Sequence, residues 1–224
     1  MIKMVVFDMA GTTVDENNLV YKTLWKIINE VGYNFSLEQV INIGAGKEKL
    51  NAIKDIIASA EPGDVAVAVA EHEIYHSFLD ELAIAYDSFS IQPQPGAEEL
   101  FETLRNKNIQ VVLNTGYNKD TAVSILKKLG WRVGAHIDAL VTATDVSSNR
   151  PDPDMILLAM KKFNIRDARE VIKVGDSVID VEEGKNAGCA LTIGITTGAH
   201  TYEQLLTARP DYIINHLSEL IPIL

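Results

Sequence analysis

Three aspartates follow two short apolar runs of the chain. Asp8 comes directly after the run at residues 4–7, and Asp176 and Asp180 come shortly after the run at residues 171–174. The four-residue spacing of the latter pair brings both carboxylates to one side of a helical turn. Carboxylates held so close repel each other unless a cation is present, and hard oxygen ligands suit Mg²⁺. We predict a Mg²⁺ site at these aspartates, although Asp8 on its own could equally cap a turn.

Two further segments carry groups that can bind phosphate. Thr115 and Gly116 follow another apolar run, so a hydroxyl and backbone N–H groups could hold phosphate oxygens there. Arg150 stands in the proline-rich segment 149–153, where the backbone has few options. Its guanidinium could bind phosphate or hold Asp8, and the alternative interpretation is a surface arginine beside Asp152.

The elements that must position these residues are strands that alternate with helices. Short apolar runs recur between segments of helical periodicity, and these segments are followed by a Gly or Asn that could end them. The alternation predicts an α/β fold, a Rossmann-like doubly wound parallel sheet with helices on both faces. Open sheets of this kind place their ligands at the carboxyl ends of the strands. The expected strands are 4–7, 110–114, 139–142, 171–174, 191–195 and 212–214, and the expected helices between them are 97–107, 119–129, 153–163 and 178–187.

A long segment separates the first expected strand from the second. It is far longer than the connection of a few residues plus one helix that joins neighbouring parallel strands. Residues 16–92 contain helical patterns only, at 19–31, 37–43, 49–58 and 65–86. We therefore predict an inserted small α-helical cap domain at 16–92 and a core formed by 1–15 and 93–224. Residues 65–70 alternate like a strand, but a helix is favoured because apolar residues continue at helical spacing to 85. Residues 92–96, with two prolines, are expected to be a stiff return linker.

Composition limits the classes of partner. The formal net charge of −11 disfavours nucleic acid, because affinity for nucleic acid comes chiefly from Lys and Arg. A single cysteine, Cys189, excludes an intrachain disulfide, and no apolar stretch approaches the roughly 18–20 residues of a membrane span. We expect a soluble, cytoplasmic protein. Without a clear oligomer signature in the sequence, either a monomer or a homodimer fits.

The order of these motifs resembles a known family. Asp8-x-Ala-Gly-Thr-Thr, the hydroxyl of Thr115, the cation of Arg150 and Gly-Asp176-Ser-x-x-Asp180 are similar to the four ordered motifs of the haloacid dehalogenase superfamily. The resemblance covers nearly the whole chain and includes a helical cap after the first motif. Within the superfamily the chain looks most like the phosphonoacetaldehyde hydrolase (phosphonatase) branch. Two residues carry this finer resemblance: Ala10, where most members have a second Asp, and Arg150, where most have Lys.

The resemblance implies a mechanism and a role for each residue. Asp8 would attack phosphorus and form an aspartyl-phosphate, which water then hydrolyses. Mg²⁺ would be bound by Asp8, the backbone carbonyl of Ala10 and Asp176, with Asp180 orienting its waters. The residues implied to bind the substrate, a small phosphorylated or phosphonate metabolite, are Gly11, Thr12, Lys47, Thr115, Gly116 and Arg150, of which Lys47, Thr115 and Arg150 are also implied to be catalytic.

Proton transfer leaves alternatives open. Ala10 cannot serve as the acid and base that a second Asp would provide. Phosphonatases use a cap lysine that forms a Schiff base with the substrate aldehyde, and Lys47 matches its spacing after Gly44, although Leu50 replaces the family's histidine. Lys47 could form this imine, bind substrate ionically or be a surface charge. Accordingly, the chain is interpreted as a phosphonatase-like hydrolase. The alternatives are an ordinary phosphate-ester phosphatase, similar to phosphoglycolate phosphatases, and a phosphometabolite-binding protein with vestigial catalysis.

Overall fold

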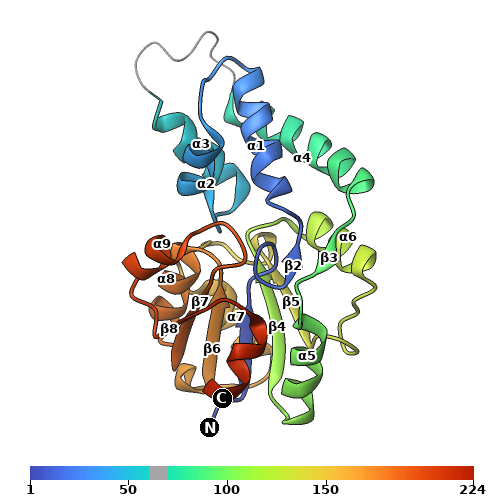
Figure 1. Ribbon diagram of the computed structural model, residues 1–224, viewed down its shortest axis with the longest axis vertical. Coiled ribbons are helices and arrows are strands. Elements are labelled where there is room, and N and C mark those ends of the chain that lie inside the picture. The colour runs from blue at the N-terminus through green and yellow to red at the C-terminus, as the bar shows by residue number, and fades with distance from the viewer. Residues whose placement is uncertain (61–69) are drawn as a thin grey trace.

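The computed structural model describes residues 1–60 and 70–224 and contains a central parallel sheet (Figure 1). Six strands form this sheet in the order β5-β4-β1-β6-β7-β8, and every neighbouring pair is parallel. This arrangement confirms the predicted α/β fold and its six strands. Their bounds are β1 Met4–Phe7, β4 Gln110–Thr115, β5 Ala139–Thr142, β6 Val171–Gly175, β7 Leu191–Ile195 and β8 Tyr212–Ile214.

The strand β1 explains why the apolar runs are continuous rather than alternating. Its side chains point to opposite faces of the sheet in turn, and both faces are covered. Val5 and Phe7 belong to one apolar cluster, and Met4 and Val6 to another, all with no exposed surface. In β1, whose two faces are both buried, every residue is therefore apolar, and the first polar side chain is that of Asp8, directly after the strand ends.

Helices pack on both faces of the sheet. Helix α5 contributes Leu100 and Phe101 to the cluster of Val5, whereas α7 contributes Met155 and Ile156 to the cluster of Met4. The short helix α9 was not predicted, and a capping box between its first residues fixes its start. The bounds are α5 Ala97–Asn106, α6 Lys119–Leu129, α7 Asp154–Lys162, α8 Val178–Ala187 and α9 Tyr202–Thr207.

The helical cap lies beyond the carboxyl ends of the strands, at the top of Figure 1. It consists of α1 Leu19–Glu30, α2 Leu37–Gly44, α3 Lys49–Ala58 and α4 Glu71–Ser88. Residues 65–69 of the helix expected at 65–86, and with them the choice between helix and strand, lie outside the described residues. An N-terminal helical region confirms the predicted cap, and the division of the chain at 15/16 and 92/93 stays a proposal. Among the described helices, none combines the length and the apolar composition needed to span a membrane.

The two connections between cap and core lie side by side. Strand β2, Val14–Asp15, pairs with β3, Gln92–Pro93, in an antiparallel ribbon of two residues on each side. The sequence predicted only a linker at 92–96. Proline does not prevent the pairing, because a strand at an edge need not donate from every backbone nitrogen.

Candidate active site

The three aspartates meet at the carboxyl ends of two adjacent strands. Asp8 follows β1 and Asp176 follows β6, while Asp180 lies in the first turn of α8. Carboxylate oxygens of all three lie within 4.8 Å of one another, and the side chains are buried. The structure thus brings together the residues that the sequence predicted as metal ligands.

The charges of this cluster are only partly balanced by protein groups. Burial raises the pKa of Asp8 above its usual range, although Arg150 opposes the shift. Burial also raises the pKa of Asp176 well above its usual range, and the neighbouring charges of Asp8 and Asp180 add to the rise. For Asp180 burial acts in the same direction, but Arg150 and Lys173 outweigh it and hold the pKa below its ordinary value. A cation beside Asp8 and Asp176 would relieve their repulsion.

The surroundings of Asp176 fit a metal ion. Thr12 Oγ1 donates to Asp176 Oδ1 at 3.1 Å, and the backbone N–H of Ala199 donates to Oδ2 at 2.6 Å. A Cβ atom at Gly11 or Gly198 would overlap the Asp176 carboxylate, so only glycine at these two positions lets the backbone pack this closely around it. Gly11 also has a φ of +82°, which favours glycine. Carboxylate and carbonyl oxygens are the donors that Mg²⁺ prefers, so the cluster could hold this ion.

Arg150 is the centre of a buried hydrogen-bond network. Its Nη1 lies 2.7 Å from Asp8 Oδ1 and 3.0 Å from Asp180 Oδ1. Its Nη2 donates to the side-chain oxygen of Asn114 at 2.7 Å, and its Nε donates to Glu183 at 2.9 Å. Burial alone would lower the pKa of Arg150, but the surrounding carboxylates raise it. The arginine is 5% exposed, so the alternative of a surface residue beside Asp152 does not hold.

Two charged residues of this network were not predicted from the sequence. Lys173 and Glu183 are buried, with 3.1 Å between Lys173 Nζ and Glu183 Oε2. Lys173 Nζ also lies 2.9 Å from Asp180 Oδ1. The available signals were a lysine within an otherwise apolar strand and a glutamate three residues after Asp180 on the same helix. Glu183 holds Arg150 and Lys173 holds Asp180 through these ion pairs, and neither residue lines the pocket described below.

The loops of the cap and the core approach each other closely above Asp8. A Cβ atom at Gly116 would overlap the backbone carbonyl of Lys47, and one at Gly46 would overlap the Ser177 hydroxyl. Thr115 is 2% exposed, and its Oγ1 accepts a hydrogen bond of 3.2 Å from the Tyr117 N–H. Cap and core are therefore in direct contact at the predicted phosphate loop.

A small pocket lies between these loops. Its free volume is about 10 Å³, enough for roughly one water molecule, so a substrate requires the cap to move away from the core. Ala10 lines it with a methyl group. The lining residues are Asp8, Ala10, Val20, Tyr21, Gly46, Lys49, Thr115, Gly116, Tyr117 and Arg150.

Two lysines near the start of α3 have different surroundings. Lys47 Nζ forms an ion pair with Asp55 at 2.6 Å, its side chain is 27% exposed, and it does not line the pocket. Its implied roles stay predictions. Lys49 is 5% exposed and does line the pocket. Burial lowers the pKa of Lys49 to about 8, although the charge of Asp8 opposes the shift.

A buried acid lies behind the pocket, where the cap joins the core. Glu16 Oε2 accepts hydrogen bonds from the Val20 N–H at 2.8 Å and from the Tyr86 hydroxyl at 3.1 Å. The hydroxyls of Tyr86 and Tyr117 are 2.6 Å apart. Burial raises the pKa of Glu16 to about 7. No separate signal in the sequence marks this cluster, because Glu16 lies between β2 and α1, Tyr86 in α4 and Tyr117 in the loop after β4.

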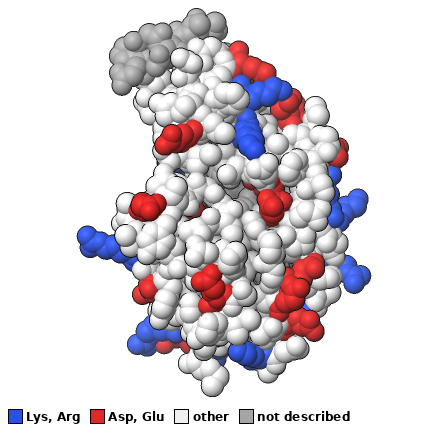
Figure 2. All heavy atoms as spheres, viewed as in Figure 1, with Lys and Arg blue, Asp and Glu red and all other residues white. Residues whose placement is uncertain are grey.

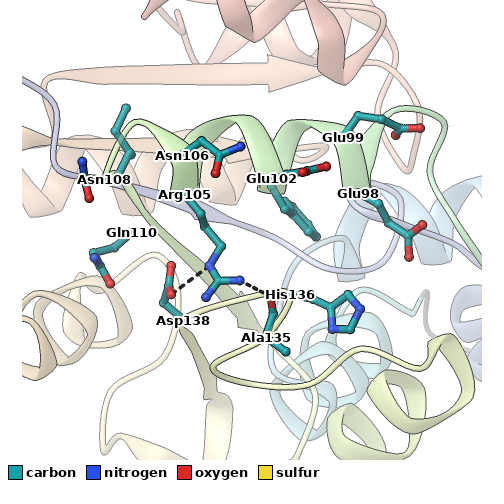
Figure 3. Close-up of a pocket in the computed structure, with 12 residues that line it drawn as sticks. Glu98, Glu99, Glu102, Arg105, Asn106, Asn108, Gln110, Ala135, His136 and Asp138 are labelled. Atoms are coloured by element: carbon teal, nitrogen blue, oxygen red, sulfur yellow. Dashed lines mark hydrogen bonds and ion pairs between the residues drawn. The ribbon is translucent and has the colours of Figure 1, made fainter.

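A larger cavity of about 800 Å³ lies at the opposite ends of the strands (Figure 3). Gln110, which begins β4, and Asp138, which directly precedes β5, line it. Arg105 donates hydrogen bonds to Asp138 Oδ1 at 3.2 Å and to the Gly134 carbonyl at 2.9 Å, so its guanidinium stabilises the loop that precedes β5. None of the predicted site residues lies here, and ligands of open α/β sheets bind at the carboxyl ends. We therefore assign the candidate active site to the smaller pocket.

Comparisons with known proteins agree with this geometry. A family model described as a haloacid dehalogenase-like hydrolase matches residues 2–188. The chain is 30% identical to the phosphonoacetaldehyde hydrolase of Latilactobacillus sakei subsp. sakei, across 100% of this chain and 95% of that protein. It is also 30% identical to the phosphonoacetaldehyde hydrolase of Bacillus cereus (strain G9842), across 88% of this chain and 77% of that protein.

Solved structures show the same fold. A phosphonoacetaldehyde hydrolase like protein from Oleispira antarctica has a TM-score of 0.83 at 22% identity, covering 99% of this chain and 91% of that one. A hydrolase from Pseudomonas syringae also has a TM-score of 0.83 at 22% identity, covering 98% of this chain and 96% of that one.

Proposed function

Because this chain belongs to the haloacid dehalogenase-like hydrolases, we propose that it is a Mg²⁺-dependent, phosphonatase-like hydrolase that transfers a phosphoryl group from a small metabolite to Asp8 and then to water. The substrate is a phosphate ester or a phosphonate. One observation carries the proposal: Asp8 lines the pocket, 2.7 Å from Arg150 and within 4.8 Å of two further buried aspartates.

The roles follow from the charges of the reaction. A carboxylate that attacks an anionic phosphoryl group needs its repulsion offset. Arg150 contributes a fixed positive charge, and the hydroxyl of Thr115 and the backbone N–H of Gly116 donate to phosphoryl oxygens. Mg²⁺ held by Asp8, Asp176 and the carbonyl of Ala10, with Asp180 orienting its waters, would supply further neutralisation of the phosphoryl group. Gly11 and Thr12 complete the phosphate loop on the side of Asp176.

The substrate is small and is not a nucleic acid. The pocket accepts a ligand only after the cap moves, and the net charge of −11 works against a polyanion. On the face shown in Figure 2, Lys and Arg side chains are scattered over cap and core and do not gather in one patch. Arg150, together with a bound Mg²⁺, would supply the local positive charge that attracts a single phosphoryl group.

Kinetics with a nucleophile variant test the proposal. Phosphate release should be measured from phosphonoacetaldehyde and a panel of small phosphate esters, with Mg²⁺ and with chelator. We expect Mg²⁺-dependent release that Asp8→Asn abolishes and the exposed control Glu102→Gln retains. A phosphoryl adduct at Asp8 after rapid acid quench would support the intermediate. An Asp8→Asn variant as active as the unmodified chain would overturn the proposal.

Lys47 decides between the phosphonate and the ester branch. Relatives at 30% identity are named phosphonoacetaldehyde hydrolases, which supports a lysine that forms an imine with an aldehyde. On the phosphonate branch, borohydride reduction during incubation with phosphonoacetaldehyde would attach substrate to Lys47, and Lys47→Gln would lose the adduct. No adduct, with esters turned over, favours the ester phosphatase. If nothing is turned over but phosphate raises the thermal midpoint, the protein is a binding protein with vestigial catalysis.

A further inference from the structure

Lys49 places a buried amine in the wall of the pocket that contains Asp8. Its Nζ donates to the backbone carbonyl of Lys47 at 2.7 Å and lies 5.6 Å and 5.3 Å from the ring centroids of Tyr21 and Tyr117. Within residues 1–60 and 70–224, no carboxylate forms an ion pair with this amine. Most buried lysines are paired, so an unpaired one facing a pocket indicates a use for its proton or its charge.

The reaction at Asp8 needs a proton carrier. An alkyl phosphate releases an alkoxide, which must be protonated as it leaves, and the water that attacks the aspartyl-phosphate must lose a proton. Asp8 is occupied as the nucleophile, Arg150 stays protonated, and the side chain of Ala10 is a methyl group that carries no proton to transfer. Three titratable side chains of the lining remain, namely Tyr21, Lys49 and Tyr117.

The surroundings of these three groups favour the lysine. Burial raises the pKa of both tyrosines well above 10, whereas burial lowers the pKa of Lys49 to about 8. Four charged groups around the pocket act on the Lys49 amine. Asp8 from the core, Glu16 from the junction of cap and core and Glu48 on its own segment raise the pKa of Lys49, and Arg150 lowers it.

We propose that Lys49 is the proton carrier of the reaction and that the substrate is a phosphate monoester with an unactivated alkoxide leaving group. In the first step a carboxylate oxygen of Asp8 forms a bond to phosphorus, and the bond from phosphorus to the leaving oxygen breaks. The leaving oxygen keeps the electron pair of the broken bond and takes a proton from the Lys49 ammonium. In the second step the neutral amine takes a proton from water as the water oxygen attacks phosphorus. The bond to Asp8 breaks, and phosphate, the Asp8 carboxylate and the ammonium are regenerated. This inference rests on the proposed function and selects its ester branch.

The position of Lys49 on the cap links proton transfer to closure. It stands at the first residue of α3, while Asp8 belongs to the core. The amine therefore reaches the leaving oxygen only when the cap contacts the core, when bulk water is excluded.

The test compares substrates whose leaving groups differ in their need for a proton. We expect Lys49→Met to lower kcat/KM for an alkyl phosphate such as phosphoglycolate by about 10²–10⁴-fold. The leaving group of p-nitrophenyl phosphate departs without a proton, so kcat/KM of Lys49→Met for this substrate should stay within about tenfold of the unmodified chain. Because the second step still lacks its base, a burst of nitrophenolate should precede slow turnover. Lys54→Met, which removes an exposed lysine from the same helix, is the matched control.

A pH profile separates proton transfer from a loss of packing or charge. With the alkyl phosphate, kcat/KM of the unmodified chain should fall as the pH rises through about 8, and this limb should be absent in Lys49→Met. Lys49→Arg keeps the charge but holds its proton too tightly, so it should behave like Lys49→Met.

Several results would overturn the inference. They are equal losses on both substrates, full rescue by Lys49→Arg, an unchanged alkaline limb, or a borohydride-stable substrate adduct at Lys49. The proposed function fails separately, if the unmodified chain shows no Mg²⁺-dependent hydrolysis of p-nitrophenyl phosphate or if Asp8→Asn retains it.

Discussion

The buried carboxyl of Glu16 should make the protein less stable as the pH rises, and the substitution Glu16→Gln should remove this part of the pH dependence. Glu16 is 1% exposed, and burial raises its pKa from 4.5 to about 7. A raised carboxyl pKa means that the folded protein binds the proton more tightly than the unfolded chain does. The stabilisation is complete below pH 4.5 and is lost as the pH rises through 7.

The size of this effect follows from the shift. At about 1.4 kcal/mol per pK unit, the shift from 4.5 to about 7 amounts to roughly 3 kcal/mol, of which about 2–3 kcal/mol falls between pH 5 and pH 8.5. For a chain of this length that corresponds to a change of about 5–10 °C in the thermal midpoint. In Glu16→Gln the amide oxygen can still accept from the Val20 N–H, and the group does not ionise. We therefore expect the variant to melt with the unmodified chain at pH 5 and about 5–10 °C above it at pH 8.5.

The assay is thermal unfolding of both proteins, followed by circular dichroism at pH 5 and pH 8.5. Other buried carboxyls also titrate, so only the difference in thermal midpoint between Glu16→Gln and the unmodified chain isolates the effect of Glu16. Glu102→Gln, at an exposed position on α5, is the matched control and should follow the unmodified chain at both pH values. If Glu16→Gln loses as much stability between pH 5 and pH 8.5 as the unmodified chain, Glu16 is ionised in the folded state and the reasoning is refuted.

Three further outcomes are expected. Gly116→Ala would place a methyl group against the Lys47 carbonyl and keep cap and core apart. We expect kcat/KM to fall about 100-fold with an unchanged circular dichroism spectrum, and full activity would show that closure does not need this contact. Arg150→Ala leaves Glu183 and Asp180 with one cation fewer, so the free energy of unfolding measured in urea should fall by about 3–5 kcal/mol. A fall of less than about 1 kcal/mol would contradict the ion-pair geometry. Added Mg²⁺ at a hundredfold excess over its Kd should stabilise the fold by about 3 kcal/mol and so raise the thermal midpoint. Asp176→Asn should abolish this rise, and an equal rise in the variant would place the ion elsewhere.

The sheet and the aspartates were predictable because strong local signals mark them. A strand buried on both faces is largely apolar, with Lys173 as the exception in β6, and the first acidic residues after β1 and β6 then stand at the carboxyl edge, where open α/β sheets place their ligands. Asp8, Asp176 and Asp180 come together for this reason. The capping residues also indicated most helix ends to within a residue or two.

The choice between Lys47 and Lys49 could not be read from the sequence. These lysines are two residues apart where the cap loop becomes α3, and the direction of each side chain depends on the residue at which the helix begins. Glu48 caps that helix through the Leu50 and Asn51 N–H groups, so Lys47 precedes the cap and Lys49 follows it. The burial of Lys49 also requires Tyr117, from a loop far away in the chain. Contacts of this kind depend on the tertiary fold and leave no periodic pattern.

The pairing of β2 with β3 bears on how such an enzyme can acquire a new substrate. Because Asp15 and Gln92 are partners in one ribbon, the inserted segment leaves and rejoins the core at a single place. An insertion with adjacent ends imposes no separation on the strands of the sheet, so another insertion, or a short turn, could replace it without altering their register. The core residues proposed to hold the phosphoryl group and the cap residues proposed to act on its leaving group could thus evolve, or be engineered, as separate modules.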